Sequence, residues 1–125
     1  MILVDSSVWV EHQRSRNLEL SRLLEEGLVY THPFVVGELA MGRFKNRQMF
    51  LDGLLALPEV TKADDLEVLR MVESHQMAGK GLGLIDAHLL ASALIDRVRL
   101  FTFDGALDRM ARALGLGWGA GPHPH

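Results

Sequence analysis

Four acidic residues are the part of this sequence that could carry chemistry. Each lies beside or within an apolar segment, and they are spread along the chain as Asp5, Glu38, Asp86 and Asp104. Alone, an aspartate that follows an apolar run is explained as a helix cap. Together, carboxylates that converge repel one another, by about 3 kcal/mol for a pair ~5 Å apart at an effective dielectric near 20. A cation would have to offset that repulsion, and a site with only oxygen ligands favours Mg²⁺ or Mn²⁺.

Two of these acids differ sharply from their surroundings. Glu38 lies in an expected helix over 33–42. The residues at helical spacing from it are Phe34, Val35, Met41 and Gly42. Asp86 opens an expected helix over 84–97 that is apolar nearly all round and should therefore be central. A buried acid is costly unless it is paired or bound to a cation. A rim position for Glu38 and a cap for Asp86 are the simpler explanations, and both stay open at this point.

The elements that must position these acids alternate along the chain. Short apolar runs predict strands at 2–4, 28–32, 59–61 and 99–103. Helical spacing, caps and glycine stops predict a short helix after Asp5 and further helices at 17–27, 33–42, 46–57, 63–79, 84–97 and 105–114. This alternation predicts an α/β fold, a three-layer sandwich in which a short, mostly parallel central sheet has helices on both faces. We expect a single domain over 1–118 and a flexible tail over 119–125.

The predicted topology places two of the acids at one edge of the sheet. Asp5 ends the first expected strand, and Asp104 follows the last. In open α/β sheets, ligands bind beyond the carboxyl ends of the strands. Divalent cations held there by carboxylates suit phosphodiester hydrolysis, because they activate water and neutralise charge on the phosphate.

Composition narrows the class of protein. The chain has 125 residues, a net charge of -3 and no cysteine, which excludes disulfides, thiolate zinc sites and cysteine nucleophiles. No segment approaches the ~18 uninterrupted apolar residues of a membrane helix, and the first residues do not resemble a signal peptide. We therefore expect a soluble, cytoplasmic protein that does not contact membranes.

Four segments of the sequence resemble the PIN-domain nucleases, and in particular the VapC-type ribonuclease toxins of bacterial toxin–antitoxin pairs. They are "ILVDSSVWVE", "PFVVGELAMG", "GKGLGLIDAHLLASAL" and "LFTFDGALDRMA", in that order over nearly the whole chain. The third segment is the most specific, because its glycine loop, its aspartate and the following "AHLLA" all match the family pattern.

This resemblance implies an endoribonuclease that depends on Mg²⁺ or Mn²⁺. It implies that the catalytic residues, and the metal ligands, are Asp5, Glu38, Asp86 and Asp104. Polar supporting residues of the family correspond to Ser6, Ser7 and Thr102. The expected partners are an RNA substrate, a second copy of the chain in a homodimer, and a small antitoxin protein that inserts into the site.

One position departs from the family pattern. Ala106 stands where the family often has a further acid, which puts a second metal ion in doubt. Asp108 lies one helical turn further on and is a candidate substitute, although its spacing does not match.

Other features allow a functional and a simpler explanation. The segment "GRFKNR" gathers Arg43, Lys45 and Arg47, which either contact RNA phosphates or form a solvated turn. We expect Trp9 to be a core or dimer-interface residue and not a platform for a base. The histidines lack ligand spacing, and we assign none of them a role.

Three alternatives to a metal-dependent ribonuclease are considered. A Mg²⁺-binding signalling receiver module normally needs adjacent acids after the first strand and a lysine after the last, and neither is present. A metal-independent ribonuclease would use a pair of histidines and form a 2′,3′-cyclic phosphate, whereas a metal-activated water leaves a 5′-phosphate. A non-catalytic binding domain of the same fold would keep all four acids without activity.

Overall fold

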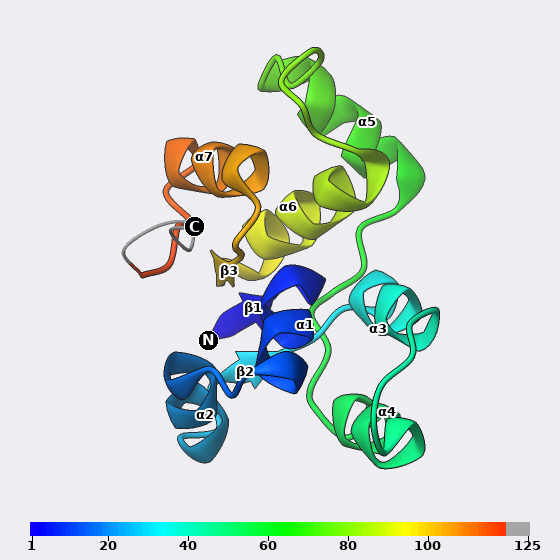
Figure 1. Cartoon of the computed structure of the whole chain (residues 1–125). Helices are drawn as coiled ribbons and strands as arrows, with labels where there is room; N and C mark the ends of the chain where they lie inside the picture. The colour runs from blue at the N-terminus through cyan, green and yellow to red at the C-terminus, as the bar shows by residue number, and fades with distance from the viewer. Residues whose placement is uncertain (120–125) are drawn as a thin grey trace.

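A computed structural model describes residues 1–119 of the chain. The tail expected at 119–125 therefore lies outside the described residues except for Gly119. The elements follow one another as β1 (Ile2–Val4), α1 (Ser6–Arg14), α2 (Leu18–Glu25), β2 (Val29–Tyr30), α3 (Pro33–Ala40), α4 (Arg47–Leu55), α5 (Asp65–Ser74), α6 (Leu84–Asp96), β3 (Arg99–Phe101) and α7 (Gly105–Ala113). Figure 1 shows how the short strands lie at the centre of these helices.

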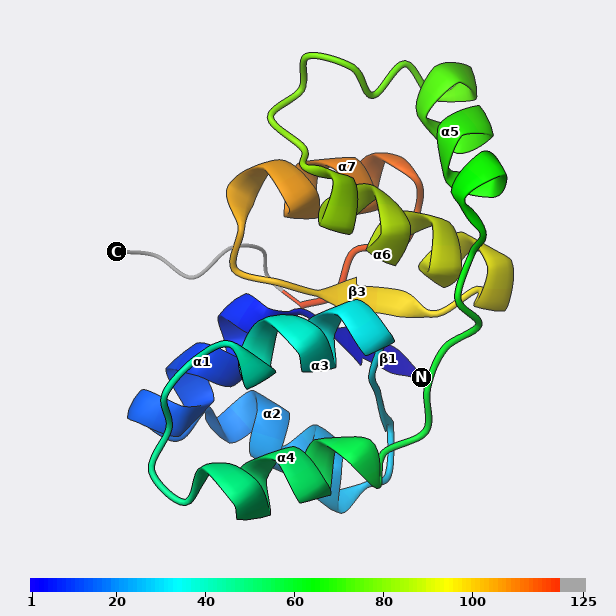
Figure 2. The same cartoon turned by 90° about the vertical axis from the view of Figure 1, so that its right-hand side faces the viewer.

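The sheet within residues 1–119 has three parallel strands in the order β2-β1-β3. The first strand of the chain is therefore the central one, and Leu3 pairs with Tyr30 on one side and Leu100 on the other. Helices α6 and α7 lie on one side of the sheet, and α1 to α4 lie on the other (Figure 2). The predicted three-layer α/β sandwich with a parallel central sheet is confirmed.

The expected strand at 59–61 is wrong. Glu59 forms only an isolated bridge with Thr31, in which the amide of Thr31 donates to Pro58 and the amide of Val60 donates to Thr31. The proline has no N–H to extend a ladder, and the amide of Thr61 turns away to the side chain of Asp96. The segment leaves the sheet at once and becomes the connection to α5.

Several expected boundaries were too wide. The helix expected at 63–79 is α5, Asp65–Ser74, which begins with a capping box between Asp64 and Glu67. It ends because Gln76 adopts a left-handed conformation, φ 52°. The strand expected at 99–103 ends at Phe101, which pairs with Val4, the last residue of the central strand.

The core lies between the sheet and the helices that cover it. All three residues of β1 are buried, and α6 has seven consecutive buried residues, from Ala87 to Ala93. Trp9 is buried and packs near Phe50, in agreement with the expected core role. Within residues 1–119, no helix combines the length and the apolar character needed to cross a membrane.

Candidate active site

Asp5 is held in place by two hydroxyl groups at the carboxyl end of the central strand. It is buried, and its Oδ2 accepts hydrogen bonds from Ser7 Oγ and Thr102 Oγ1, both at 2.7 Å. The same oxygen accepts from the amide of Ser7 at 3.4 Å and so caps α1. Within residues 1–119, all hydrogen bonds to this carboxylate go to Oδ2, which leaves Oδ1 for a ligand.

Asp104 is tied to Asp5 through Thr102. The hydroxyl of Thr102 accepts from the amide of Asp104 at 3.0 Å while it donates to Asp5. Ser7 has the same double role, because its Oγ accepts from the amide of Phe103 at 3.0 Å. Asp104 itself is exposed and caps α7 by accepting from the amide of Leu107. The expected supporting roles of Ser7 and Thr102 thus correspond to real contacts with the acids.

Glu38 reaches the same region from the opposite side. It lies on α3 and is exposed, so it occupies the rim position that the sequence left open, and its Oε1 accepts from Ser6 Oγ at 3.2 Å. Partial burial of the carboxyl group raises its pKa, and the nearby carboxylates of Asp5 and Asp86 raise it further, against the opposing effect of the Ser6 hydrogen bond.

Asp86 lies in the first turn of α6. Its Oδ2 accepts from the amide of Gly83 at 3.0 Å, which closes the first turn of the helix. Burial is again the main cause that raises its pKa, and the carboxylates of Asp104 and Asp5 add to the effect, while the Gly83 bond opposes it.

The four predicted acids lie within electrostatic range of one another, because Asp5 and Asp86 act on Glu38, and Asp5 and Asp104 act on Asp86. We call them the acid site: Asp5, Glu38, Asp86 and Asp104. Asp5, Asp86 and Asp104 also accept hydrogen bonds at the N-terminal ends of helices. Their role as helix caps is therefore compatible with a place in the acid site. The positive N-terminal ends of α1, α6 and α7 point at this site and partly offset its charge.

The acid site is not neutralised by basic side chains. Within residues 1–119, none of its carboxylates forms an ion pair, including with Arg109 on the helix that follows Asp104. The carboxylates are also spread out: among the described residues, no three histidine or acidic side chains are gathered closely enough to hold one ion. Each acid is instead held by at least one hydrogen bond from a hydroxyl group or a backbone amide.

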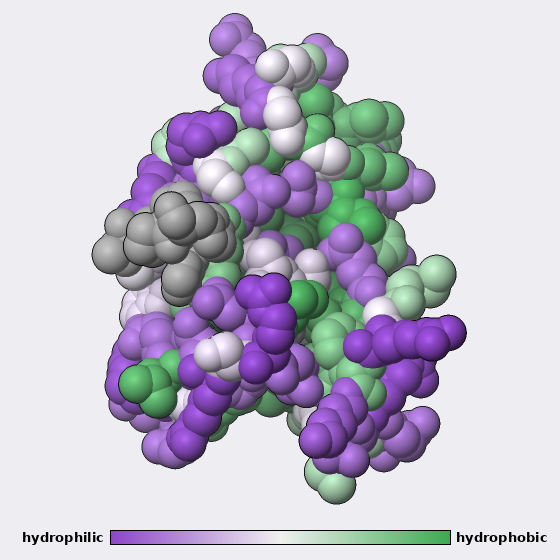
Figure 3. Space-filling model, viewed as in Figure 1, coloured by the Kyte–Doolittle hydropathy of each residue, from purple (hydrophilic) through white to green (hydrophobic). Residues whose placement is uncertain are grey.

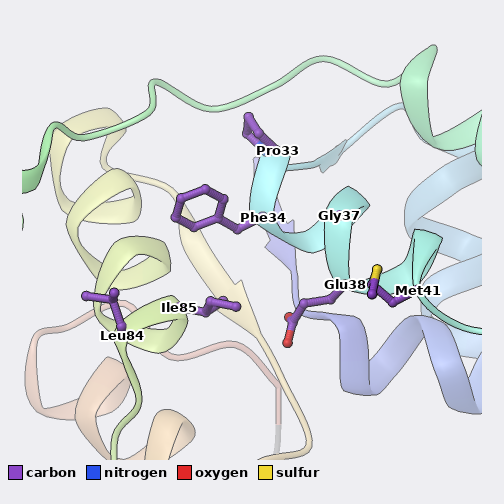
Figure 4. Close-up of a pocket in the computed structure, with 7 residues that line it drawn as sticks. All are labelled: Pro33, Phe34, Gly37, Glu38, Met41, Leu84 and Ile85. Carbon is purple, nitrogen blue, oxygen red and sulfur yellow. The ribbon is translucent and has the colours of Figure 1, made fainter.

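Two hollows open at the acid site. One, of about 450 Å³, is lined by Asp5, Ser6, Ser7 and Asp104, together with residues of α1. The other, of about 390 Å³, is an apolar groove between α3 and the start of α6 (Figure 4). Glu38 lies at its edge, and its other walls include Phe34, Met41 and Leu84. Hydrophobic surface is visible on this side of the molecule in Figure 3.

The three predicted RNA-binding residues divide into two groups. Arg43 and Lys45 line a further hollow of about 280 Å³ together with Arg14, which the sequence analysis missed. Arg47 lines none of these three hollows, and its guanidinium donates to the carbonyl of Ala40 at the end of α3. The sequence could have indicated Arg14, because it lies two helical turns after Ser6 and Ser7 and so on the same face of the same helix.

Asp108 does not replace the missing acid. Its side chain is buried and accepts from Arg112 Nε at 2.8 Å. Arg112 in turn donates to the carbonyls of Trp118 and Gly119, so the pair fastens the end of the described chain. Ala106, at the position of the missing acid, faces the backbone of Gly81 in the loop before α6.

Two histidines have structural roles that the sequence analysis did not assign. His32 Nδ1 accepts from the amide of Phe34 and caps α3, the helix that carries Glu38. His12 Nδ1 accepts from the amide of Asn17, the cap of α2. Asparagine, serine and aspartate are the usual caps, so a histidine in this position gives no signal in sequence.

Comparison with known proteins identifies a family and similar proteins. Residues 2–113 match the PIN domain family. Over 117 residues, the chain is 44% identical to the protein named Ribonuclease VapC32 from two strains of Mycobacterium tuberculosis, CDC 1551 / Oshkosh and ATCC 25618 / H37Rv. In both cases the alignment covers 93% of this chain and 94% of the relative.

Proposed function

Since this chain belongs to the PIN-domain family, in its VapC-type group, we propose that it is an endoribonuclease that depends on Mg²⁺ or Mn²⁺ and hydrolyses RNA phosphodiester bonds. The observation that carries the proposal is the acid site, in which four carboxylates from distant segments interact through space at one edge of the sheet. The name of the Mycobacterium tuberculosis relative supports the substrate class.

The chemistry of the acid site fits a hard divalent cation. All of the donors are carboxylate oxygens, and the raised pKa values of Glu38 and Asp86 show that their negative charge is unfavourable as it stands. The residues proposed to hold the ion are Asp5, Glu38, Asp86 and Asp104. A bound ion would neutralise these charges and supply the Lewis acidity for attack of water on the phosphodiester.

The polar residues around the acids would orient them. Ser7 and Thr102 fix one oxygen of Asp5, and the other oxygen has no hydrogen bond within residues 1–119. Ser6 connects α1 to Glu38 and so couples the two sides of the site. We propose that these three residues position ligands and do not themselves react.

The partners of the protein are part of the same proposal. The resemblance predicts a small antitoxin that inserts into the site and a homodimer, and we propose both, with the cytoplasm as the place of action because RNA is the substrate. Substrate binding is assigned to Arg43 and Lys45, which line a basic hollow, and to Arg47, which is exposed beside them.

The test is cleavage of total RNA by the purified chain and by Asp5→Asn. We expect cleavage with Mg²⁺ that leaves 5′-phosphate ends, no cleavage with chelator, and a loss of about 100-fold or more in Asp5→Asn, because the variant lacks one ligand charge. Asp52→Asn, an exposed carboxylate on α4, is the matched control and should cut like the unmodified protein.

Two results would contradict this proposal. One is cleavage that persists in chelator or in Asp5→Asn. The other is a 2′,3′-cyclic phosphate product, which would point to the metal-independent histidine mechanism.

A further inference from the structure

Two of the hollows near the acid site join along one helix. The hollow that contains Asp5 and Asp104 is also lined by Val10 and Arg14, and so is the hollow that contains Arg43 and Lys45. Val10 and Arg14 are one turn apart on α1, and both are exposed. The exposed face of α1 is therefore a continuous surface from one hollow to the other, about 13 Å long for its nine residues.

The second hollow has the opposite charge from the first. Its lining includes three cations, Arg14, Arg43 and Lys45, and no acid. The chain as a whole carries a net charge of -3, so this cluster differs from the average surface. Within residues 1–119, none of the three forms an ion pair. Three exposed cations without partners, beside the site where a phosphodiester is to be cut, favour a polyanion that spans both hollows.

Phe44 adds an apolar surface to the basic hollow. Its ring is half-buried, packs edge-on against Phe50 at 5.0 Å, and still lines the hollow between Arg43 and Lys45. A partly buried ring that lines the hollow beside two cations suits an unpaired base, because stacking is sequence-tolerant and the cations would contact the phosphates. A duplex would keep its bases out of reach of such a ring.

We propose that Arg14, Arg43, Lys45 and Phe44 form a subsite for single-stranded RNA on one side of the cleaved bond. Arg14 is its central residue, because it lines both hollows and lies between the basic cluster and the acid site. The substrate strand runs from the acid site along α1, over Val10, into the basic hollow. This inference rests on the proposed ribonuclease function and adds to it the residues that hold the strand beside the cleaved bond and the direction in which the strand leaves the site.

The test measures binding, so that it does not depend on cleavage. A fluorescent single-stranded RNA of random sequence is titrated with the full chain in chelator at several salt concentrations. We expect Arg14→Gln to weaken binding about fivefold and the triple variant with Arg43→Gln and Lys45→Gln to weaken it about 100-fold. The slope of log K against log salt should fall by about 0.7 for each phosphate contact that is lost.

Two matched variants control for loss of charge and for misfolding. Arg70→Gln makes the same change on an exposed position of α5, beyond the opposite face of the sheet, and should leave binding and its salt slope unaltered. Gln13→Lys adds a fourth cation to the basic hollow and should tighten binding about threefold with a steeper salt slope. A gain of affinity cannot result from unfolding.

The outcomes separate this inference from the proposed function. If Arg14→Gln and Gln13→Lys bind like Arg70→Gln, the subsite is overturned, even where the chain cuts RNA with Mg²⁺. If duplex RNA binds as tightly and loses as much affinity in the triple variant, the single-strand assignment is overturned. If the triple variant binds RNA normally but no longer binds an acidic antitoxin, the cluster is a protein-binding surface instead. Absence of cleavage by the unmodified chain would overturn the proposed function, and the binding data would still stand.

Discussion

Thr102 shows how one hydroxyl group can organise a site. It is buried, donates to Asp5 and accepts from the amide of Asp104, so it links the ends of β1 and β3. The two acids whose backbone positions follow from the sheet are thereby also fixed relative to each other. Ser7 repeats this arrangement, because its hydroxyl also donates to Asp5 and accepts from a backbone amide, that of Phe103.

Removal of the Thr102 hydroxyl should therefore affect both stability and catalysis. Thr102→Val keeps the shape but leaves the Asp104 amide without its acceptor, which we expect to cost about 1–3 kcal/mol in the free energy of unfolding. Loss of Asp5 orientation should lower RNA cleavage at least tenfold. Thr102→Ser restores the hydroxyl and should recover most of the cleavage. Equal cleavage by the valine and serine variants would show that the contact does not position the acid.

We expect the ionised carboxylate of Asp86 to destabilise the metal-free protein and to stabilise the metal-bound protein. Because its pKa is raised in the folded protein, its stabilising contribution is complete below the ordinary pKa of an aspartate and is lost as the pH rises through the folded value. At pH 7 the ionised group therefore destabilises the metal-free protein. Asp86→Asn keeps an acceptor for the Gly83 amide and should raise metal-free stability by about 0.5 kcal/mol, a value kept small because the group is half exposed.

Thermal melts in chelator and in Mg²⁺ check this prediction. The variant should melt higher than the unmodified chain in chelator and lower in Mg²⁺, since only the unmodified site gains full binding energy from the ion. Asp52→Asn should follow the unmodified chain in both buffers. A variant that melts lower in both buffers would mean that the carboxylate stabilises the fold without an ion.

At the scale of single elements, α3 depends on an unusual cap. His32 is fully buried, and its pKa is lowered to about 4, mainly by burial and in smaller part by His88 and Lys62. Its Nδ1 accepts the Phe34 amide, so the ring is neutral with its proton on Nε2, which has no hydrogen-bond partner among the described residues. Protonation would remove the acceptor from the start of the helix that carries Glu38.

The cap should make the fold sensitive to mild acid. A histidine whose folded pKa is lowered stabilises the protein above its unfolded pKa of ~6.5, and this contribution is lost as the pH falls toward about 4. Between pH 7 and pH 5 we expect a loss of about 2 kcal/mol in the free energy of unfolding, measured with urea. His32→Asn keeps a capping oxygen and should lack this loss. A pH dependence identical in both proteins would assign the effect to other groups.

The elements themselves were largely predictable, and the exceptions have local causes. Periodicity and caps located every helix from α1 to α7, because apolar faces and end residues are properties of the segment alone. The residues after Glu59 have strand character and predict a strand, yet strand pairing depends on a partner that the segment's own sequence does not show. The end of α5 depended on the left-handed conformation of Gln76, a residue type that carries no strong signal for it.

At the scale of the whole molecule, the convergence of the acids was predictable for a topological reason. Carboxyl ends of parallel strands share one edge, so Asp5 and Asp104 had to be neighbours. The contacts that refine the site were not predictable, because they depend on side-chain directions: Asp108 points into the core toward Arg112, and Arg14 joins the two hollows. Both residues lie on helices that were correctly predicted, and only the packing decides which way they face.

The strand order β2-β1-β3 also determines when the acid site can form during translation. Asp5 depends on a hydroxyl that lies 97 positions later in the chain, and the central strand lacks one of its two neighbours until β3 has been translated. A polypeptide still attached to the ribosome, or one released early by a premature stop codon before residue 99, cannot gather its four carboxylates. The acid site, and any activity that depends on it, can therefore form only after nearly the whole chain has been synthesised.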